Sequence, residues 1–482
     1  MHRITPTQAW PLYSTAATRA LEADAQGVQA PHALMQRAGL AVAQLALAAA
    51  PHARRVWLAC GPGNNGGDGL EAAMHLQQWG RVPVVTWLGN ESSAPADARA
   101  SLTRARDAGV RFASEPPQDL TAQDLCIDAL LGIGSRRPAD GPMAACIEAL
   151  NTLAPPILAV DVPTGLDADT GATHGPHVRA RWTLSLLTLK PGLFTGHGRD
   201  AAGQVWLDAL GVDANQTAAT AWLAGPPAAS ARPHASHKGS YGDVAVIGGA
   251  PGMSGAAQLA ARAALHGGAG RVFLALLDGA GTTYDPAQPE LMLRDWQTLD
   301  LQTMAVVCGC GGGDAVRHVL APVLSGAGKL VLDADALNAL ATDTQLLALL
   351  RARAQRHPHS TVATPHPLEA ARLLGCSSAD IQADRLKAAQ QLAQQLGCAV
   401  ILKGSGSVLA QPEDAPWINP TGKPLLATAG TGDVLAGLAG ALLASGARAF
   451  DAAAQAAWRH GRAADQWPAG QTLTASALAA RL

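Results

Sequence analysis

A glycine-rich turn that directly follows an apolar run limits the possible folds of this chain more than any other feature. Residues 60–69 read Cys-Gly-Pro-Gly-Asn-Asn-Gly-Gly-Asp-Gly and come after the run Val56–Ala59. Glycines at this density let a backbone bend sharply and approach a ligand closely. The pattern predicts a strand that enters the turn and a helix over Leu70–Trp79 that leaves it, with free amide groups that can bind an anion.

The polar residues of this turn make its signal specific. Three of its glycines have the Gly-x-Gly-x-x-Gly spacing of dinucleotide-binding proteins, which is a weak signal by itself. Asn64, Asn65 and Asp68 add amides and carboxylate oxygens at the same place. A structural tight turn is the plain alternative, although a connection alone rarely needs so many special residues.

Length and composition favour a multidomain globular enzyme. The chain has 482 residues, which predicts two or three domains, and its 48% hydrophobic and 15% charged residues suit packed cores. A net charge of −2 and 4% aromatic residues argue against nucleic acid as a partner. The seven widely spaced cysteines favour a reduced, cytoplasmic protein. No membrane partner is expected, because the Ala-rich run Ala41–Ala50 is too short to span a bilayer.

Short apolar runs alternate with helical patterns in both halves, which predicts two α/β domains with parallel sheets. In the first half we expect strands at 55–59, 82–87, 125–128, 157–161 and 182–187, and helices at 31–49, 70–79, 95–108 and 144–152. In the second half we expect strands at 243–247, 271–275, 305–308, 330–332, 361–363 and 399–402, and helices at 255–266, 315–324, 367–374, 383–396 and 433–444. An Ala- and Pro-rich linker over 216–232 is expected to separate domains 1–215 and 233–482.

Two acidic residues end predicted strands of the first half. Asp128 and Asp161 each stand at the carboxyl end of an apolar run, and Thr164 lies in the turn after the second run. Ligands of open α/β sheets bind at such strand ends. We therefore expect Asn65, Asp128 and Thr164 to converge as hard oxygen ligands for a cation such as potassium or magnesium. A cap or turn role is the alternative for each residue taken alone.

Four motifs give the first half a family resemblance. Leu34–Gly39, the turn 60–69, Asp128–Gly134 and Val160–Asp167 resemble the NAD(P)H-hydrate epimerase family over roughly residues 5–215. The resemblance implies a Rossmann-like three-layer αβα fold and a potassium ion held by Asn65, Asp128 and Thr164. It implies substrate contacts by Asn64, Asn65, Gly66, Gly67, Asp68, Gly132, Ile133, Gly134, Ser135, Arg136, Arg137, Pro138 and Asp161. The family more often has Ser at the position of Thr164 and Glu at that of Gln36.

The second half has its own glycine-rich helix start. Ala429-Gly430-Thr431-Gly432-Asp433 leads into a helical run, so that its amides can stabilise a phosphate and Asp433 can take a proton from a hydroxyl. An N-capping aspartate is the structural alternative. His366 follows a predicted strand and can equally be a helix cap. Lys403–Ser407 is a further turn that can wrap a nucleotide phosphate.

These motifs resemble the NAD(P)H-hydrate dehydratase family of the ribokinase-like superfamily, over roughly residues 230–480. The resemblance implies a ribokinase-like αβα domain with substrate contacts by Ala256, Gly311, His366 and Asp433. It implies contacts with the adenine nucleotide by Lys403, Gly404, Ser405, Gly406, Ser407 and Gly432. Ala429 and Leu368 stand where the family commonly has glycine.

Together the two resemblances imply the repair of one damaged metabolite. Hydrated NADH and NADPH carry a hydroxyl at C6 of the nicotinamide ring in R and S forms. The first domain would interconvert the two forms with Asp161 as the acid/base group. The second would dehydrate the S form with Asp433 as the base, while ADP becomes AMP and phosphate. Magnesium with the nucleotide and a homo-oligomer are also expected.

Two alternatives stay open at this point. The second half can be a ribokinase-like kinase of a small, vitamin-type molecule, because that superfamily shares the turn with Asp433. The first half can be a binding module without catalysis, although the presence of Asn65, Asp128 and Asp161 argues against this.

Overall fold

The computed structural model describes residues 1–134, 138–214, 217–228, 233–279 and 284–482. Two compact units make up the chain, one of residues 1–5 and 10–222 and the other of residues 6–9 and 223–482. The first unit thus extends to Trp222, beyond the end at residue 215 expected from the sequence. Two short strands, β2 (Trp10–Leu12) and β10 (Ala221–Leu223), lie near the two ends of its main segment.

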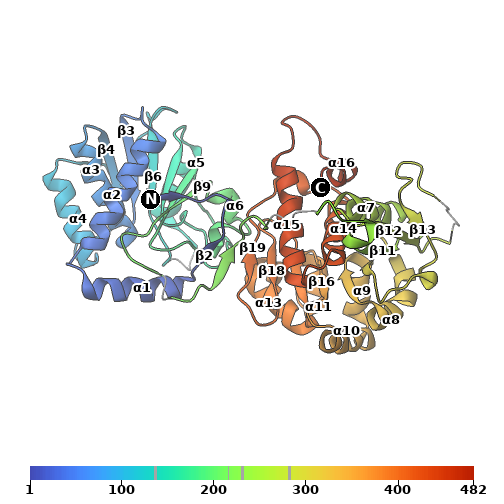
Figure 1. Cartoon of the computed structure of the whole chain (residues 1–482). Helices are drawn as coiled ribbons and strands as arrows, with labels where there is room; N and C mark the ends of the chain where they lie inside the picture. Colours follow the sequence, from blue (N-terminus) through green and yellow to red (C-terminus); the bar gives the residue numbers. More distant parts are fainter. Residues whose placement is uncertain (135–137, 215–216, 229–232, 280–283) are drawn as a thin grey trace. The chain divides into compact units, whose positions relative to one another are not determined.

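A mostly parallel sheet forms the centre of the first unit (Figure 1). Its order is β1-β9-β8-β7-β6-β3-β4-β5, and only the β1–β9 pair is antiparallel among the described strands. The strands are β1 (His2–Arg3), β3 (Arg55–Cys60), β4 (Val82–Trp87), β5 (Arg111–Phe112), β6 (Leu125–Ala129), β7 (Ile157–Val160), β8 (Trp182–Leu186) and β9 (Gln204–Asp208). The helices are α1 (Thr15–Val28), α2 (Ala33–Ala49), α3 (Asn64–Gln78), α4 (Ala96–Asp107), α5 (Gly141–Thr152) and α6 (Gly198–Ala201).

Successive residues of β3 pack into opposite layers, because side chains alternate across a strand. Val56 and Leu58 belong to a core with residues of α2, α3 and α4. Trp57 and Ala59 belong to a second core with residues of α5. All four side chains are buried, so this strand needs the continuous apolar run that its sequence has. The first unit is therefore a three-layer αβα sandwich.

The second unit repeats this architecture around a longer sheet. Its strands follow the order β13-β12-β11-β14-β15-β16-β17-β18-β19, parallel up to β17 and antiparallel from β17 to β19. These strands are β11 (Asp243–Gly248), β12 (Arg271–Leu276), β13 (Met292–Leu293), β14 (Ala305–Cys308), β15 (Lys329–Leu332), β16 (Thr361–Ala363), β17 (Ala399–Leu402), β18 (Val408–Ala410) and β19 (Trp417–Ile418).

Helices cover both faces of this second sheet. Ala245 and Ile247 of β11 pack into a core with α8–α13, whereas Val244 and Val246 pack with α7, α14 and α15. The helices are α7 (Ser254–His266), α8 (Val316–Gly326), α9 (Ala334–Thr342), α10 (Thr344–Arg356), α11 (Pro367–Leu374), α12 (Ser378–Ala383), α13 (Arg385–Leu396), α14 (Thr431–Ala444), α15 (Ala449–Asp465) and α16 (Ala475–Ala479).

One prediction was wrong in a way that matters for the site. The helix expected at Leu70 begins at Asn64, so Gly66, Gly67 and Gly69 lie inside α3, whereas Gly61 and Gly63 stay in the turn before it. A Cβ atom on Gly66 would lie 2.0 Å from the carbonyl oxygen of Gly61, and one on Gly67 would lie 2.7 Å from Met35. Close packing of α3 thus requires glycines, although glycine has a low intrinsic helix propensity.

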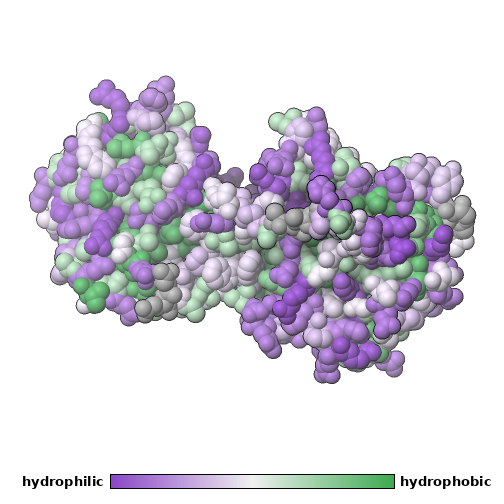
Figure 2. Space-filling view, viewed as in Figure 1, coloured by the Kyte–Doolittle hydropathy of each residue, from purple (hydrophilic) through white to green (hydrophobic). Residues whose placement is uncertain are grey.

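Polar side chains dominate the face of each unit that is seen in Figure 2. Figure 2 shows hydrophilic side chains over much of the visible face of each unit, with hydrophobic ones in small groups between them. Val28, at the end of α1, is an exception with 86% of its surface exposed. Within the described residues, no helix has both the length and the apolar character needed to cross a membrane.

Candidate active sites

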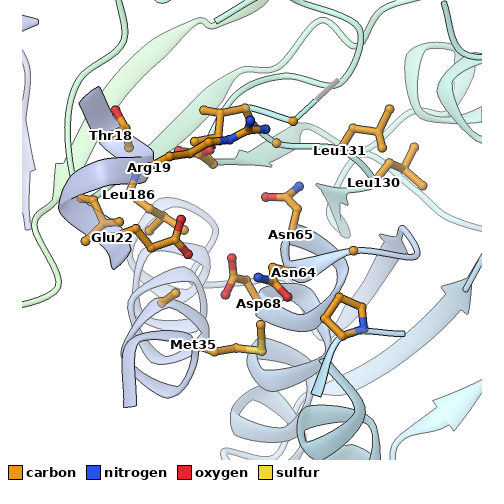
Figure 3. Close-up of a pocket in the computed structure, with 18 of the residues that line it drawn as sticks. Thr18, Arg19, Glu22, Met35, Asn64, Asn65, Asp68, Leu130, Leu131 and Leu186 are labelled. Atoms are coloured by element: carbon orange, nitrogen blue, oxygen red, sulfur yellow. Dashed lines mark hydrogen bonds between the residues drawn. The ribbon is translucent and has the colours of Figure 1, made fainter. Parts of the chain in front are cut away.

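A cavity of about 1000 Å³ opens in the first unit beside the carboxyl ends of the central strands (Figure 3). The predicted substrate contacts that line it are Asn64, Asn65, Asp68, Gly132, Ile133, Gly134, Pro138 and Asp161. Gly66 and Gly67 are instead buried within α3, where they allow close packing. The predicted contacts Ser135, Arg136 and Arg137 lie outside the described residues.

Asp161 has an unusual backbone conformation just after β7. Its φ is 66°, in the left-handed region that non-glycine residues seldom adopt. Its Oδ1 accepts hydrogen bonds from Lys190 Nζ and, at 3.3 Å, from the amide of Leu186. Its Oδ2 accepts one from the amide of Ile133 at 3.4 Å. Backbone strain of this kind persists where the surroundings fix it, and it concentrates at functional sites.

Lys190 is the residue of this site that sequence reasoning missed. Its side chain is fully buried, and Nζ donates to Asp161 Oδ1 and, at 2.6 Å, to the carbonyl oxygen of Leu186. A buried ion pair adds little net stability, which makes a structural reason alone a poor explanation for it. The available signal was a lysine within the apolar stretch that follows β8.

Asp128 and Thr164 form a second buried pair in the first unit. Asp128 Oδ1 accepts a hydrogen bond from Thr164 Oγ1 at 2.7 Å, and Oδ2 accepts one from the Thr164 amide at 2.8 Å. Burial raises the pKa of Asp128 to about 6, although these hydrogen bonds act in the opposite direction. The structure thus brings two of the three predicted cation ligands into contact.

Asn65, the third predicted cation ligand, lies beside Asp161. A Cβ atom on Gly132 would lie 3.1 Å from both Asn65 Oδ1 and Asp161 Oδ2, so the two oxygens converge on the space that this glycine leaves open. In the described part of the chain, Asn65 Nδ2 is buried without a hydrogen-bond partner. A buried amide without a partner favours a ligand at this point.

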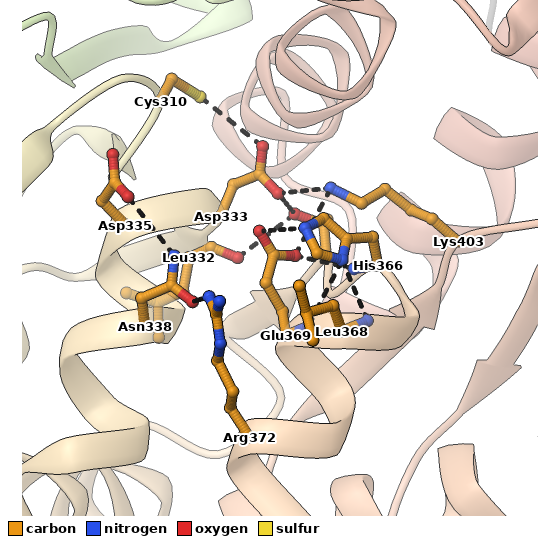
Figure 4. Close-up of polar contacts among 11 residues, drawn as sticks. Cys310, Leu332, Asp333, Asp335, Asn338, His366, Leu368, Glu369, Arg372 and Lys403 are labelled. Atoms are coloured by element: carbon orange, nitrogen blue, oxygen red, sulfur yellow. Dashed lines mark hydrogen bonds and ion pairs between the residues drawn. The ribbon is translucent and has the colours of Figure 1, made fainter. Parts of the chain in front are cut away.

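Asp333 is the centre of a buried polar cluster in the second unit (Figure 4). Its Oδ1 accepts hydrogen bonds from Lys403 Nζ at 2.8 Å and from Thr364 Oγ1 at 2.7 Å. Its Oδ2 lies 3.8 Å from the thiol of Cys310. These residues follow neighbouring parallel strands, β14 to β17, so the strand ends assemble the cluster.

Asp433 approaches this cluster from the first turn of α14. The N-cap of that helix is Gly430, with a φ of 86°, so the alternative in which Asp433 caps the helix is wrong. One ligand atom each of Asp433, Asp333 and Cys310 lies within 4.8 Å of the others. Burial, followed by the charge of Asp333, raises the pKa of Asp433 to about 7. A carboxyl group with this pKa is suited to exchange protons near neutral pH.

Two predicted nucleotide contacts, Gly432 and Lys403, lie together at the same helix start. A Cβ atom on Gly432 would lie 3.2 Å from Lys403 Nζ, so the ammonium lies against the glycine of the first turn. Gly404 has a φ of 142°, and the buried guanidinium of Arg385 lies directly against it. Arg385 donates to the carbonyl oxygen of Lys403 at 3.2 Å, a support for this turn that sequence reasoning missed. Ser405, Gly406 and Ser407 complete the turn.

His366 and Glu369 cap the start of α11. His366 Nδ1 accepts from the amides of Leu368 and Glu369 at 3.1 and 3.3 Å, and Glu369 Oε2 accepts from the His366 amide at 2.7 Å. The capping alternative for His366 is therefore confirmed. Its ring is nevertheless 45% exposed and still accessible to a ligand. Burial raises the pKa of Glu369 to about 7.

Ala256 and Gly311, the other predicted substrate contacts, touch each other. Gly311 has a φ of 58°, and a Cβ atom there would lie 2.8 Å from the Cβ of Ala256. A larger side chain at either position would therefore close this part of the site. With acid/base groups and glycine-rich backbone at the strand ends of each unit, the fold and the sites define a two-domain α/β enzyme that acts on small molecules.

Comparisons with known proteins specify this class further. A family model described as NAD(P)H-hydrate dehydratase matches residues 244–482, and one described as YjeF-related protein N-terminus matches residues 31–192. The bifunctional NAD(P)H-hydrate repair enzyme of Escherichia coli K12 is 38% identical over 455 residues, which are 90% of this chain and 84% of that protein. The Moorella thermoacetica enzyme of the same name is 36% identical, over 86% and 83% of the two chains.

A solved structure is also similar to part of this chain. The ADP/ATP-dependent NAD(P)H-hydrate dehydratase of Bacillus subtilis, co-crystallised with ATP and Mg²⁺, is 29% identical with a TM-score of 0.43, over 52% of this chain and 91% of that one. The chain belongs to the family of bifunctional NAD(P)H-hydrate repair enzymes, with an epimerase domain followed by a dehydratase domain. The predicted fold class, a Rossmann-like αβα domain and a ribokinase-like αβα domain, is confirmed.

Proposed function

We propose that domain 1–215 interconverts the R and S forms of hydrated NADH and NADPH, and that domain 233–482, after a linker at 216–232, dehydrates the S form with ADP. The observation that carries this proposal is the presence of two separate acid/base sites at strand ends, one in each unit of a chain from this family. The pairing is chemically sensible, because a dehydratase specific for S would leave the R form unrepaired.

In the epimerase domain, Asp161 is the acid/base group. Epimerisation requires a bond at C6 to break and to form again on the other face of the ring, and a proton must move with it. Lys190 holds Asp161 Oδ1, which leaves Oδ2 beside Gly132 to exchange that proton with the substrate. Asn65 Oδ1 converges on the same space and can orient the hydroxyl group.

Potassium fits the donor atoms around Asp128 in the epimerase domain. The Asp128 carboxylate, the Thr164 hydroxyl and the carbonyl oxygen of Leu131, 3.2 Å from that hydroxyl, are hard oxygen donors. With Asn65 they form the proposed ligand set, and a bound cation would favour the ionised carboxylates nearby. A crystal soaked in rubidium salt should give an anomalous peak at Asp128 and Thr164. The absence of this peak at full soaking would overturn the assignment.

In the dehydratase domain, Asp433 is the base. It takes the proton of the C6 hydroxyl, whose oxygen forms a bond to the β-phosphorus of ADP while the bond from that phosphorus to AMP breaks. The amides at the start of α14 and the ammonium of Lys403 stabilise the transferring phosphoryl group. The ring nitrogen then expels phosphate from C6, and loss of a proton from C5 restores the double bond of NADH or NADPH.

The nucleotide and its metal belong to this second site. Lys403–Ser407 and Gly432 contact ADP, and Ala256, Gly311, His366 and Asp433 contact the hydrate. Magnesium, when bound with the nucleotide, would neutralise phosphate charge. A homo-oligomeric state stays a prediction. A cytoplasmic location is also a prediction, and it is supported by the fact that Cys60, Cys126, Cys146, Cys308, Cys310, Cys376 and Cys398 are all unpaired.

One incubation tests both activities. With ADP, the wild-type protein should convert a mixture of R and S hydrates completely to NADH. A variant that lacks epimerase activity should consume only the S hydrate and leave the R hydrate. Without ADP, the wild-type protein should only equilibrate R and S. A stable phosphorylated product would instead identify a small-molecule kinase, and unchanged R hydrate would make the first domain a binding module.

A further inference from the structure

Helix α1 presents a polar stripe to the cavity of the epimerase domain. Thr18, Glu22 and Gln26, spaced four residues apart, line the cavity together with Arg19. Figure 3 shows Thr18, Arg19 and Glu22 on this helix, on the side of the pocket. The helix precedes residues 31–192, the segment that the family model of the first domain matches. None of the predicted substrate contacts lies on α1, so its cavity-facing residues have no role in the reaction as described above.

Hydrogen bonds fix the position of α1 relative to the strand ends that carry the catalytic residues. Thr18 Oγ1 lies 2.7 Å from Thr188 Oγ1, two residues before Lys190, and the Thr15 amide donates to Asp169 Oδ1 at 2.6 Å. Ser14 caps the helix. A residue on α1 therefore has a fixed position relative to Asp161, as a binding residue requires.

The described residues around the cavity carry more acidic than basic side chains, so an anionic substrate needs a positively charged partner there. Its described acidic residues are Glu22, Asp68, Asp97, Asp140 and Asp161, and its described basic residues are Arg19 and Lys190. Lys190 is already bound to Asp161. Burial and neighbouring carboxylates raise the pKa of Glu22 and of Asp68. Arg19 acts to lower the pKa of Glu22, which indicates that the charge of Arg19 reaches into the cavity. An anionic substrate needs a positive partner in such surroundings.

Arg19 is placed to be that partner. Within the described residues, its guanidinium takes part in no hydrogen bond or ion pair. Its Nη2 lies 3.5 Å from the position that a Cβ atom on Gly134 would occupy, so it faces the backbone of the loop that begins at Gly132. The planar fork of a guanidinium matches two phosphate oxygens at once.

We propose that Arg19, with the backbone at Gly134, forms a subsite for the phosphate groups of the hydrated dinucleotide in the epimerase domain. This inference rests on the proposed epimerase function. The phosphate groups do not change when C6 reacts, so the subsite binds the substrate equally in the ground state and in the transition state. Its loss should therefore raise KM and leave kcat nearly unchanged.

The test compares Arg19→Ala with Arg99→Ala, a control on α4 that removes an exposed arginine that does not line the cavity. Epimerisation is measured with the hydrates of NADH and of reduced nicotinamide riboside, which has no phosphate. Arg19→Ala should raise KM for the NADH hydrate by about 10- to 100-fold, as expected for a charge-assisted hydrogen bond, and leave the riboside hydrate unaffected. Arg19→Lys should recover part of the loss, and Arg99→Ala should behave as wild type.

A second measurement uses inorganic pyrophosphate as a competitive inhibitor of the same reaction. Its inhibition constant should rise in Arg19→Ala and not in Arg99→Ala. An unchanged KM and inhibition constant in Arg19→Ala, or an equal loss with the riboside hydrate, would overturn the phosphate subsite. Failure of the wild-type protein to epimerise any hydrate would instead overturn the proposed function, so the two failures are distinct.

Discussion

The two active sites hold their central carboxylates in different ways. In the epimerase domain, Asp161 is hydrogen-bonded to the buried ammonium of Lys190. In the dehydratase domain, the corresponding ammonium of Lys403 is hydrogen-bonded to Asp333, and the pKa of Asp433 rises to about 7. The first site therefore depends on an ion pair that fixes the orientation of its carboxylate. The second depends on a carboxyl group that can gain and lose a proton near neutral pH.

The largest expected effect is the loss of dehydration in Asp433→Asn. The amide keeps the shape of the side chain but cannot act as a base, so the rate of dehydration should fall about 10²–10⁴-fold. Epimerisation by the same sample should be unaffected. Asp451→Asn is the matched control, because Asp451 occupies the same position in the first turn of α15 and is exposed. A fall of less than tenfold in Asp433→Asn would remove this residue from the role of base.

The ion pair of the epimerase domain predicts a split between stability and activity. Asp161→Asn should abolish epimerisation and, because Lys190 is left as an unpaired buried charge, lower the free energy of unfolding by about 3–5 kcal/mol. The double variant Asp161→Asn/Lys190→Met removes both charges. It should regain most of that stability in denaturant titrations and remain inactive. A double variant as unstable as the single one would show that the ion pair is not the cause.

Titration of Asp433 predicts a pH dependence for dehydration alone. A raised pKa of about 7 means that the carboxyl group is protonated below that pH and cannot accept the substrate proton. The kcat/KM for dehydration should therefore fall roughly tenfold per pH unit well below pH 7 and level off above it. Glu369 also has a pKa of about 7, so Glu369→Gln is the necessary control. If kcat/KM of the Glu369→Gln variant still falls at acidic pH, this acid limb belongs to Asp433. If the acid limb is absent in that variant, the assignment to Asp433 is wrong.

Local sequence signals were sufficient for elements that are apolar and short. The bounds of β4, β14, β17 and α11 agree residue for residue with those predicted from the sequence. The start of α3 was predicted six residues too late, because its glycines signal a turn by propensity but serve helix packing in the fold. Helices α1, α9, α10 and α15 were not predicted, although each is amphipathic or Ala-rich.

The same limit applies to the sites. Asp161 and Asp433 could be found from the sequence, because an acid at a strand end or a glycine-rich helix start is a local signal. For Lys190 the sequence shows only a lysine within an apolar stretch, and for Arg19 no signal, since the roles of both depend on tertiary placement. Lys190 acts through a partner 29 residues away, and Arg19 belongs to a helix that precedes every strand with an acid of the site.

The smallest expected effect concerns Cys310, whose thiol stands beside Asp433 where the epimerase domain has an ammonium beside Asp161. A thiol is a weak hydrogen-bond donor, so Cys310→Ala should change the plateau rate of dehydration by less than about threefold. Because the hydrogen bond from Cys310 lowers the pKa of Asp433, its removal should move the acid limb to higher pH, by less than about one unit. Cys308→Ala, which removes a buried thiol two residues earlier, should leave the limb in place. A shift to lower pH in Cys310→Ala, or the same shift in both variants, would contradict this role for the thiol. The thiol beside Asp433 would then not distinguish the dehydratase site from the epimerase site.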